Sequence, residues 1–164
     1  MTAELNAAPD TKLIELLSYI EKDSVHEPFF REIVHLAINM SRTGSVIIGF
    51  FGTPGFSIVA SAGNVISYER GQLLETLVRS ENYIEIEDTL RHSHYKFNAQ
   101  ILEVPVIRFL AGMPIIDSEG SVIGAIGLAD TKPRKFSGEQ IQSLGILSRL
   151  VTIHLGLKEK LYKL

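Results

Sequence analysis

The side chains with the greatest capacity for chemistry gather in the middle of the chain. Arg108 could hold an anionic ligand group, because a planar guanidinium donates paired hydrogen bonds to carboxylates and phosphates. The alternative is that Arg108 pairs with Asp88, or donates to a backbone carbonyl, and so fixes the loop between them, since buried charges are usually paired. Both interpretations direct attention to the stretch between residues 88 and 108.

Two histidines in this stretch, His92 and His94, form an H-x-H pair. On a strand both rings would share one face and could hold a metal. No third ligand is evident nearby and the segment is typical of a loop, so we expect solvated histidines and no metal. Nothing in the sequence argues for a haem ligand among His26, His35 and His154, and we expect no cofactor.

Sequence signatures of catalysis are lacking. There is no G-x-S-x-G, H-E-x-x-H or P-loop motif, and no cysteine for thiol chemistry, disulfides or thiolate metal sites. Glu85 and Glu87 lie near Asp88, but alternation along the strand sends both glutamates to its wet face, which favours solubility over general acid–base chemistry. We therefore predict no catalytic residue and a protein that is not an enzyme.

Composition narrows the class of protein further. With 45% hydrophobic and 21% charged residues, the chain should fold around a core rather than remain disordered. A net charge of -3 offers no basic surface for nucleic acid, and no apolar run approaches the roughly 20 residues of a membrane span. The N-terminus lacks the basic segment and apolar stretch of a signal peptide, so we expect a cytoplasmic protein.

Hydrophobic periodicity predicts the elements that position these residues. One helix is expected over residues 10–20, and a second begins near Pro28 and ends at Thr43–Gly44. Residues 45–52 should form a buried strand, with 56–62 as its hairpin partner. A weakly helical stretch, 67–80, precedes an alternating strand within 82–88, in which Ile84 and Ile86 share one face.

The second half of the chain begins with the longest stretch that has no clear period, residues 91–106, in which we expect one short helix near 97–102. A glycine-rich hairpin follows from about residue 107 to 130. Ser137 and Gln140 form a capping box for a last helix that carries two apolar stripes. The first stripe comprises Ile141, Leu144, Leu147, Val151 and Leu155, and the second comprises Ile146, Leu150, Ile153, Leu157, Leu161 and Leu164. One stripe should pack on the sheet and the other on a partner subunit, because its 4-3 spacing favours helix–helix contact.

This order of elements predicts an α+β fold with a mostly antiparallel sheet in a single domain, residues 1–164. N-terminal helices occupy residues 1–43, the sheet and pocket segments 45–130, and the C-terminal helix 137–164. Small and aromatic residues could line a ligand cavity beside the hairpin, and ordinary core packing is the alternative for them. The candidates are Phe109, Ala111, Ile123, Ala125 and Gly127 on the hairpin, with Tyr68, Tyr95 and Phe97 closing the far side.

A series of motifs covers about a third of the chain, between Glu87 and Gln140. It consists of Asp88-Thr89, Asn98, PVIRFLAGMP at 105–114, DSEG at 117–120, VIGAIGLAD at 122–130 and KPRKFSGEQ at 132–140. In order and spacing this series resembles the GAF domain, in the subgroup found as sensor modules of bacterial signalling proteins.

The resemblance implies a central antiparallel sheet whose one face is covered by the N- and C-terminal helices, which often form a dimer bundle. Loops and short helices on the other face would form a pocket for a small molecule. Asp88, Asn98 and Arg108 would join the aromatic and small residues named above as ligand-binding residues. The expected function is a non-enzymatic sensor module that acts through a homodimer and a signalling partner protein. The alternative is a degenerate GAF domain used for dimerisation or protein binding without a ligand.

Departures from the family pattern limit which ligand the resemblance implies. Bilin-binding relatives attach their chromophore through cysteine, and free methionine sulfoxide reductases also need cysteines. Cyclic-nucleotide relatives carry an Asn-Lys pair where this chain has Ala129-Asp130. His92-Ser93-His94-Tyr95 stands where the sensor subgroup usually has Asp-Pro-Arg-Phe. The resemblance therefore implies a small-molecule pocket without naming its ligand.

Overall fold

The computed structural model describes residues 28–52, 55–64 and 81–162, so the predicted helices at 10–20 and 67–80 lie outside the described residues. The elements in chain order are α2 (Pro28–Ser41), β1 (Ser45–Phe51), β2 (Phe56–Gly63), β3 (Ile84–Ile86), the 3-10 helix η2 (Thr89–Arg91), α4 (Ala99–Leu102), β4 (Phe109–Ile116), β5 (Val122–Asp130) and α5 (Gly138–Tyr162). This confirms the predicted α+β class.

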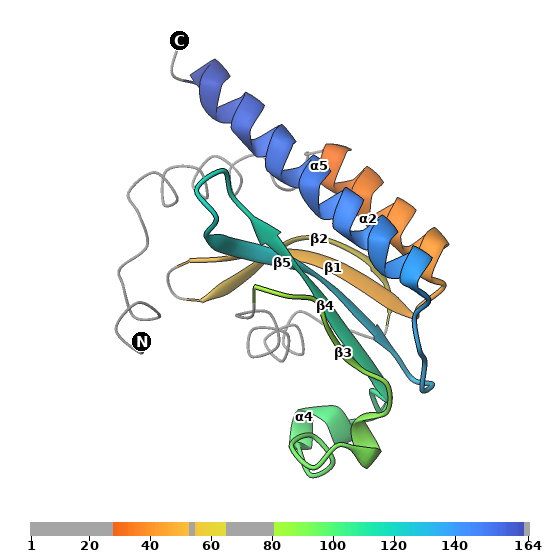
Figure 1. Cartoon of the computed structure of the whole chain (residues 1–164). Coiled ribbons are helices and arrows are strands. Elements are labelled where there is room, and N and C mark those ends of the chain that lie inside the picture. Colours follow the sequence, from red (N-terminus) through yellow and green to blue (C-terminus); the bar gives the residue numbers. More distant parts are fainter. Residues whose placement is uncertain (1–27, 53–54, 65–80, 163–164) are drawn as a thin grey trace.

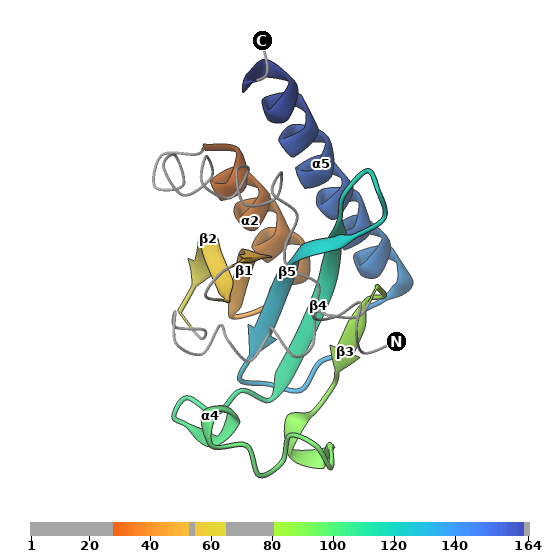
Figure 2. The ribbon, with the colours of Figure 1, turned by 90° about the vertical axis from the view of Figure 1, so that its left-hand side faces the viewer.

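The five strands form one antiparallel sheet in the order β2-β1-β5-β4-β3. Helices α2 and α5 lie side by side across one face of this sheet (Figure 1). The segment that contains η2 and α4 lies at the end of the sheet away from these helices, below β3 and β4 in Figure 2. Only three residues of β3 pair with β4, so the rest of β4 forms the edge of the sheet within the described part of the chain.

The glycine-rich hairpin β4–β5 owes two of its glycines to geometry. A Cβ on Gly124 would lie 2.2 Å from the carbonyl oxygen of Gly49 on β1, so only glycine allows this close approach. Gly120 has a φ of 84° in the turn, where the Asp117 carboxylate accepts hydrogen bonds from the backbone of Glu119 and Ser121. The glycines of this hairpin therefore serve strand packing and a tight turn.

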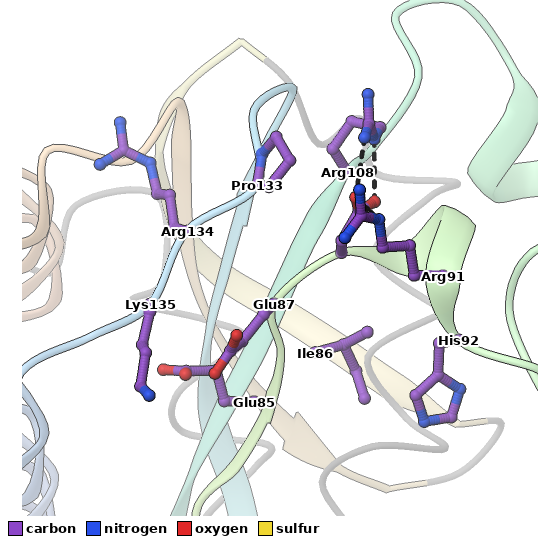
Figure 3. A pocket seen from close by; sticks show the side chains of 10 residues that line it. Glu85, Ile86, Glu87, Arg91, His92, Arg108, Pro133, Arg134 and Lys135 are labelled. Atoms are coloured by element: carbon purple, nitrogen blue, oxygen red, sulfur yellow. Dashed lines mark hydrogen bonds and ion pairs between the residues drawn. The ribbon is translucent and has the colours of Figure 1, made fainter.

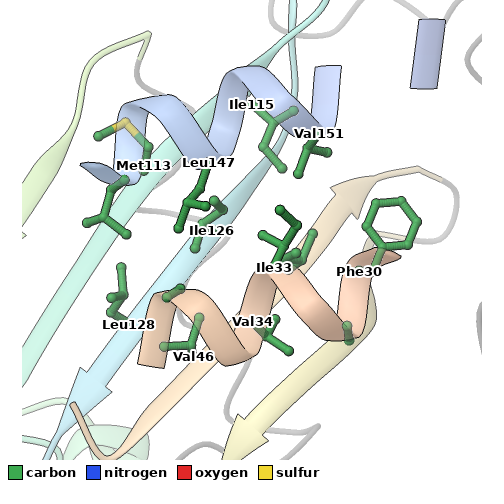
Figure 4. Packing of buried hydrophobic residues seen from close by; sticks show 14 of the residues in the cluster. Phe30, Ile33, Val34, Val46, Met113, Ile115, Ile126, Leu128, Leu147 and Val151 are labelled. Atoms are coloured by element: carbon green, nitrogen blue, oxygen red, sulfur yellow. The ribbon is translucent and has the colours of Figure 1, made fainter. Parts of the chain in front are cut away.

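The helix-side core fills the space between the sheet and helices α2 and α5 (Figure 4). Phe30, Ile33 and Val34 contribute from α2, and Leu147 and Val151 from α5, at the spacing of one face of a helix. The strands contribute Val46, Phe50, Phe109, Ala111, Met113, Ile115, Ile126 and Leu128. This core explains why the two helices are held on one face.

A loop-side core covers the opposite face of the sheet. Its buried members are Ile47, Phe56, Ile86, Tyr95, Ile101, Ile107, Leu110, Ala125 and Ala129. Tyr95 and Ile101 come from the segment between η2 and β4, so that segment is anchored on the sheet by apolar contacts. The two cores together give the sheet two buried faces, as the long apolar strands predict.

Helix α5 has the predicted capping box, and its first predicted stripe packs on the sheet. The Ser137 hydroxyl accepts a hydrogen bond from the Gln140 backbone at 3.1 Å, and the Gln140 side chain accepts one from the Ser137 backbone at 2.9 Å. The first stripe is buried from Leu144 to Leu155. Buried Ser148 also donates to the Pro114 carbonyl at 2.6 Å, which ties the helix to β4.

The second stripe of α5 is exposed along the helix as far as Leu161, and Leu164 lies outside the described residues. The exposed fractions are 44% for Ile146, 41% for Leu150, 58% for Ile153, 56% for Leu157 and 69% for Leu161. Between the two stripes His154 stacks on Phe29 of α2, with ring centroids 3.9 Å apart. Of the helices in the described residues, none combines the length and the apolar character needed to cross a membrane.

Candidate functional site

Asp88 and Arg108 form a bidentate ion pair beside the end of β3. Arg108 Nε donates to Asp88 Oδ1 at 2.9 Å, and its Nη2 donates to Oδ2 at 2.8 Å. These hydrogen bonds hold the pKa of Asp88 below its usual value, with a further contribution from the Leu90 backbone N–H, and they raise the pKa of Arg108. The Arg108 side chain is 33% exposed and Asp88 only 12%, so the guanidinium also faces solvent.

Backbone contacts hold the segments that carry this pair, Asp88 at the start of η2 and Arg108 just before β4. The Thr89 backbone N–H donates to the Arg108 carbonyl at 2.8 Å, and the buried Thr89 hydroxyl donates to the Ile107 carbonyl at 2.6 Å. The Arg108 backbone N–H donates to the Asp130 carbonyl at 2.8 Å. Of the two interpretations of Arg108, the structure shows the pairing with Asp88 that closes the loop between residues 88 and 108.

The residues that follow β5 run beside the outer edge of β3. The Arg134 backbone donates to the Glu87 carbonyl at 3.1 Å, and the Phe136 backbone donates to the Glu85 carboxylate at 3.2 Å. Tyr83 donates to the same carboxylate oxygen at 2.6 Å, and burial raises the pKa of Tyr83 above its usual value, assisted by this hydrogen bond. Alternation predicted that Glu85 faces solvent. The structure places it half-buried, because this segment partly covers the edge strand.

An open groove of about 670 Å³ lies between these two parts of the chain (Figure 3). Its lining residues are Glu85, Ile86, Glu87, Asp88, Arg91, His92, Arg108, Pro133, Arg134 and Lys135. One wall is β3 with the turn that follows it, and the other is the segment that leads into α5. The volume lies within the range of small-molecule sites, about 300 to 1,000 Å³.

Arg134 connects the groove wall to the end of α2. Its guanidinium forms a salt bridge with buried Asp130 and donates to the Arg42 carbonyl at 2.6 Å, just after the last residue of α2. Its backbone is the donor to Glu87 described above. A single residue therefore contacts the residue after β3, the last residue of β5 and the residue after α2.

The other predicted ligand-binding residues that the structure describes lie outside the groove. Tyr95 is buried in the loop-side core, whereas Phe97 is 80% exposed with the Lys96 ammonium 5.0 Å from its ring centroid. Asn98 is the N-cap of α4, where its side chain accepts hydrogen bonds from the backbone of Gln100 and Ile101. Tyr68 lies outside the described residues.

Phe109 and Ala111 occupy the face of the sheet opposite to the one predicted for them. Both are fully buried in the helix-side core. Alternation along β4 turns its odd-numbered residues toward α2 and α5, which leaves Leu110 on the loop side. They are thus placed as ordinary core residues of the helix face, which corrects their expected position beside a cavity on the loop face.

Several groove residues were not singled out by the sequence, namely Arg91, Pro133, Arg134 and Lys135. The last three belong to the KPRKFSGEQ motif, but nothing in that motif indicates that it passes beside β3. The described residues contain no group of three or more potential metal ligands. His92 and His94 lie in the loop as predicted, each with its ring near Tyr95.

Comparison with protein families decides which family this fold represents. Residues 26–155 match the family model of the GAF domain. The chain belongs to the GAF domain family. The match covers all five strands of the described sheet, the whole of α2 and α5 as far as residue 155, in agreement with the resemblance of the central motifs.

Solved structures show the same fold at low sequence identity. A domain of a two-component sensor histidine kinase protein from Sinorhizobium meliloti 1021 has a TM-score of 0.69 and 15% identity, and the alignment covers 84% of this chain and 96% of that one. The GAF3 domain of a protein from Synechocystis sp. PCC6803, in its photoproduct state, has a TM-score of 0.64 and 12% identity, with 82% and 95% covered.

A third similar structure belongs to an enzyme. The type II free methionine-R-sulfoxide reductase from Thermoplasma acidophilum has a TM-score of 0.62 and 14% identity, with 76% of this GAF domain and 88% of that chain covered. A search of characterised protein sequences finds no match. At these identities the structural likeness establishes the shared GAF fold.

Proposed function

We propose that this GAF domain is a non-enzymatic sensor module, which binds a small molecule in the groove beside β3 and acts in cytoplasmic signal transduction through a helix-mediated homodimer. The main support is the connection between groove and helix. Residues 133–135 form one wall of the groove, and α5 begins at Gly138 with its outer apolar stripe exposed.

The exposed stripe of α5 supports a second copy of the chain as the binding partner. Leu150, Ile153, Leu157 and Leu161 repeat at spacings of three and four along one face, which is the pattern of helix–helix contact. The residues are 41% to 69% exposed in one subunit. A symmetric dimer would cover the stripe on both subunits at once.

Groove occupancy can influence this interface only if the ligand prefers one arrangement of the helices over another. Arg134 offers a physical connection, because it holds the groove wall to β3, to Asp130 and to the end of α2. A ligand that draws Lys135 toward β3 would also act on the start of α5. The signal would then pass to a partner protein.

The absence of cysteine from the sequence supports a binding role over the reductase chemistry of the structurally similar enzyme. Thiol chemistry would have no nucleophile in this chain. We therefore place no catalytic residue in the groove.

A library of small metabolites, nucleotides and tetrapyrroles, screened by thermal shift on the full chain, tests the sensor function. A true ligand should raise the melting temperature of the wild type, because binding to the folded state stabilises it. The shift should fall in Arg108→Gln and persist in Glu119→Gln, an exposed residue of the β4–β5 turn. If no compound produces an Arg108-dependent shift, ligand sensing in the groove is refuted.

The alternative function is a GAF domain used for dimerisation or protein binding without a ligand. The bidentate pairing of Asp88 with Arg108 favours it, because each group already satisfies the other. The same screen separates the two functions. Stable dimers together with no Arg108-dependent ligand would favour the alternative.

A further inference from the structure

The two ends of the groove carry opposite net charge. At one end the guanidinium groups of Arg91 and Arg108 outnumber the single Asp88 carboxylate. At the other end the carboxylates of Glu85 and Glu87 outnumber the Lys135 ammonium. We name these the cationic end and the acidic end. Figure 3 shows Lys135 on the same side as the two glutamates, with Arg108 and Arg91 grouped apart from them.

Bonding within the protein leaves hydrogen-bonding capacity at both ends. Arg91 is 89% exposed and reaches Asp88 only at 3.8 Å, so its guanidinium can bind another carboxylate. His92 Nδ1 accepts from the His94 backbone, so a neutral ring carries its proton on Nε2 as a donor. Among the described residues neither Glu87 nor Lys135 belongs to an ion pair. The remaining groove cation, Arg134, is neutralised by Asp130 outside the lining.

We infer that the ligand of this groove is a small dipolar molecule of the amino-acid class, with a carboxylate at the cationic end and an ammonium at the acidic end. This inference rests on the proposed function, since it names the ligand class of the same site. A simple anion would be attracted by Arg91 and repelled by Glu87. A simple cation would be attracted by Glu87 and repelled by Arg91. Only a molecule with both charges gains from both ends.

Charge balance also selects a carboxylate over a phosphate. The cationic end has one net positive charge, which one carboxylate neutralises, whereas a phosphate dianion leaves an excess of negative charge near Asp88. The separation of the two charges in the ligand should therefore control affinity.

Titration of the full chain with ω-amino acids, followed by heteronuclear NMR, tests this ligand class. The probes are β-alanine, 4-aminobutyrate and 6-aminohexanoate, with hexanoate and hexylamine as matched compounds that each lack one charge. We expect one ω-amino acid to shift the amides of Ile86 and Lys135 with a dissociation constant of about 1 mM or lower. Each single-charge compound should bind at least about tenfold more weakly, a loss of about 1.4 kcal/mol, because one end of the groove is left without its charge partner.

Variants identify which end holds which charge. Glu87→Gln and Arg91→Gln should each weaken the best ω-amino acid about tenfold, while Glu119→Gln leaves it unchanged. Both side chains are exposed, so the variants should fold. Equal binding of hexanoate and 6-aminohexanoate, or Glu87→Gln without effect, overturns the dipolar class.

Failure of this inference can be told apart from failure of the proposed function. If no ω-amino acid shifts a groove amide at about 10 mM, well above the expected dissociation constant, the ligand class is wrong. A library compound whose thermal shift depends on Arg108 would then still support the sensor. If no such compound is found either, both the dipolar ligand class and ligand sensing in the groove are refuted.

Discussion

Replacing Leu157 on the outer stripe of α5 should dissociate the proposed dimer and leave the subunit intact. Leu157 is 56% exposed in one subunit. Full burial of a leucine side chain contributes about 1.5 to 3 kcal/mol, so covering the exposed part contributes about 1 kcal/mol per subunit and about 2 kcal/mol per symmetric dimer. Leu157→Ala should therefore weaken dimerisation about 30-fold, at about 1.4 kcal/mol for each tenfold change.

Leu157→Glu should have a larger effect, because it also places a carboxylate in an apolar interface. We expect dimerisation to weaken at least about 100-fold, as measured by sedimentation velocity over a range of protein concentrations. In the monomer the same substitution lies on the surface and should change stability by no more than about 0.5 kcal/mol. Circular dichroism at low protein concentration would measure this.

Leu102→Glu is the matched control for Leu157→Glu. Leu102 is 43% exposed and lies on α4, at the end of the sheet away from α5 (Figure 1). Leu102→Glu makes the same chemical change on a different surface, so it should leave the dimerisation constant unchanged. If Leu157→Glu and Leu102→Glu have the same dimerisation constant as the wild type, the outer stripe of α5 is not the interface.

Three further predictions concern the subunit itself. Gly156→Ala should stabilise the subunit by about 0.5 to 1 kcal/mol, because a Cβ there meets no atom within 4 Å and alanine favours the helix. Gly124→Ala should instead lower the midpoint of urea unfolding, because its Cβ would meet the backbone of β1. Equal effects of the two substitutions would contradict the close approach of β1 and β5 at Gly124. Ser148→Ala should destabilise by about 1 kcal/mol in urea unfolding, since it removes a buried hydrogen bond; an unchanged midpoint would show that this bond contributes nothing. Because the pKa of Asp88 is lowered in the folded state, its pairing stabilises the fold above the ordinary pKa of about 4, and this stabilisation is lost as the pH falls through the folded pKa. Asp88→Asn should therefore flatten the dependence of the free energy of unfolding on acid pH. An unaltered profile would show that another carboxyl controls this dependence.

The sequence predicted the elements well where one physical rule controls them. The period of apolar residues placed α2, the strands and α5 close to their observed bounds, and the Ser137–Gln140 capping box formed as expected. The two stripes of α5 also followed from spacing alone. Local periodicity is sufficient for such features because the burying surface lies along a single element.

The face of β4 and the groove itself could not be predicted in this way. Alternation shows that Arg108 and Phe109 point to opposite faces, but it does not reveal which face α2 and α5 cover. The position of residues 133–136 beside β3 depends on a connection across the sheet, as does the contact of Arg134 with Arg42. Such contacts join segments distant in sequence, and no local pattern encodes them.

The most direct test of a sensor that works through its helices is the monomer–dimer equilibrium of the full chain, measured by sedimentation velocity with and without the best-binding ω-amino acid. We predict a reversible dimer whose dissociation constant changes when both grooves are saturated, by the square of the factor by which dimerisation changes the affinity of each groove for the probe. A chain that stays monomeric to about 1 mM, where association would be weaker than about -4 kcal/mol, would contradict the dimer. A dimer with the same dissociation constant at saturating probe would contradict the coupling.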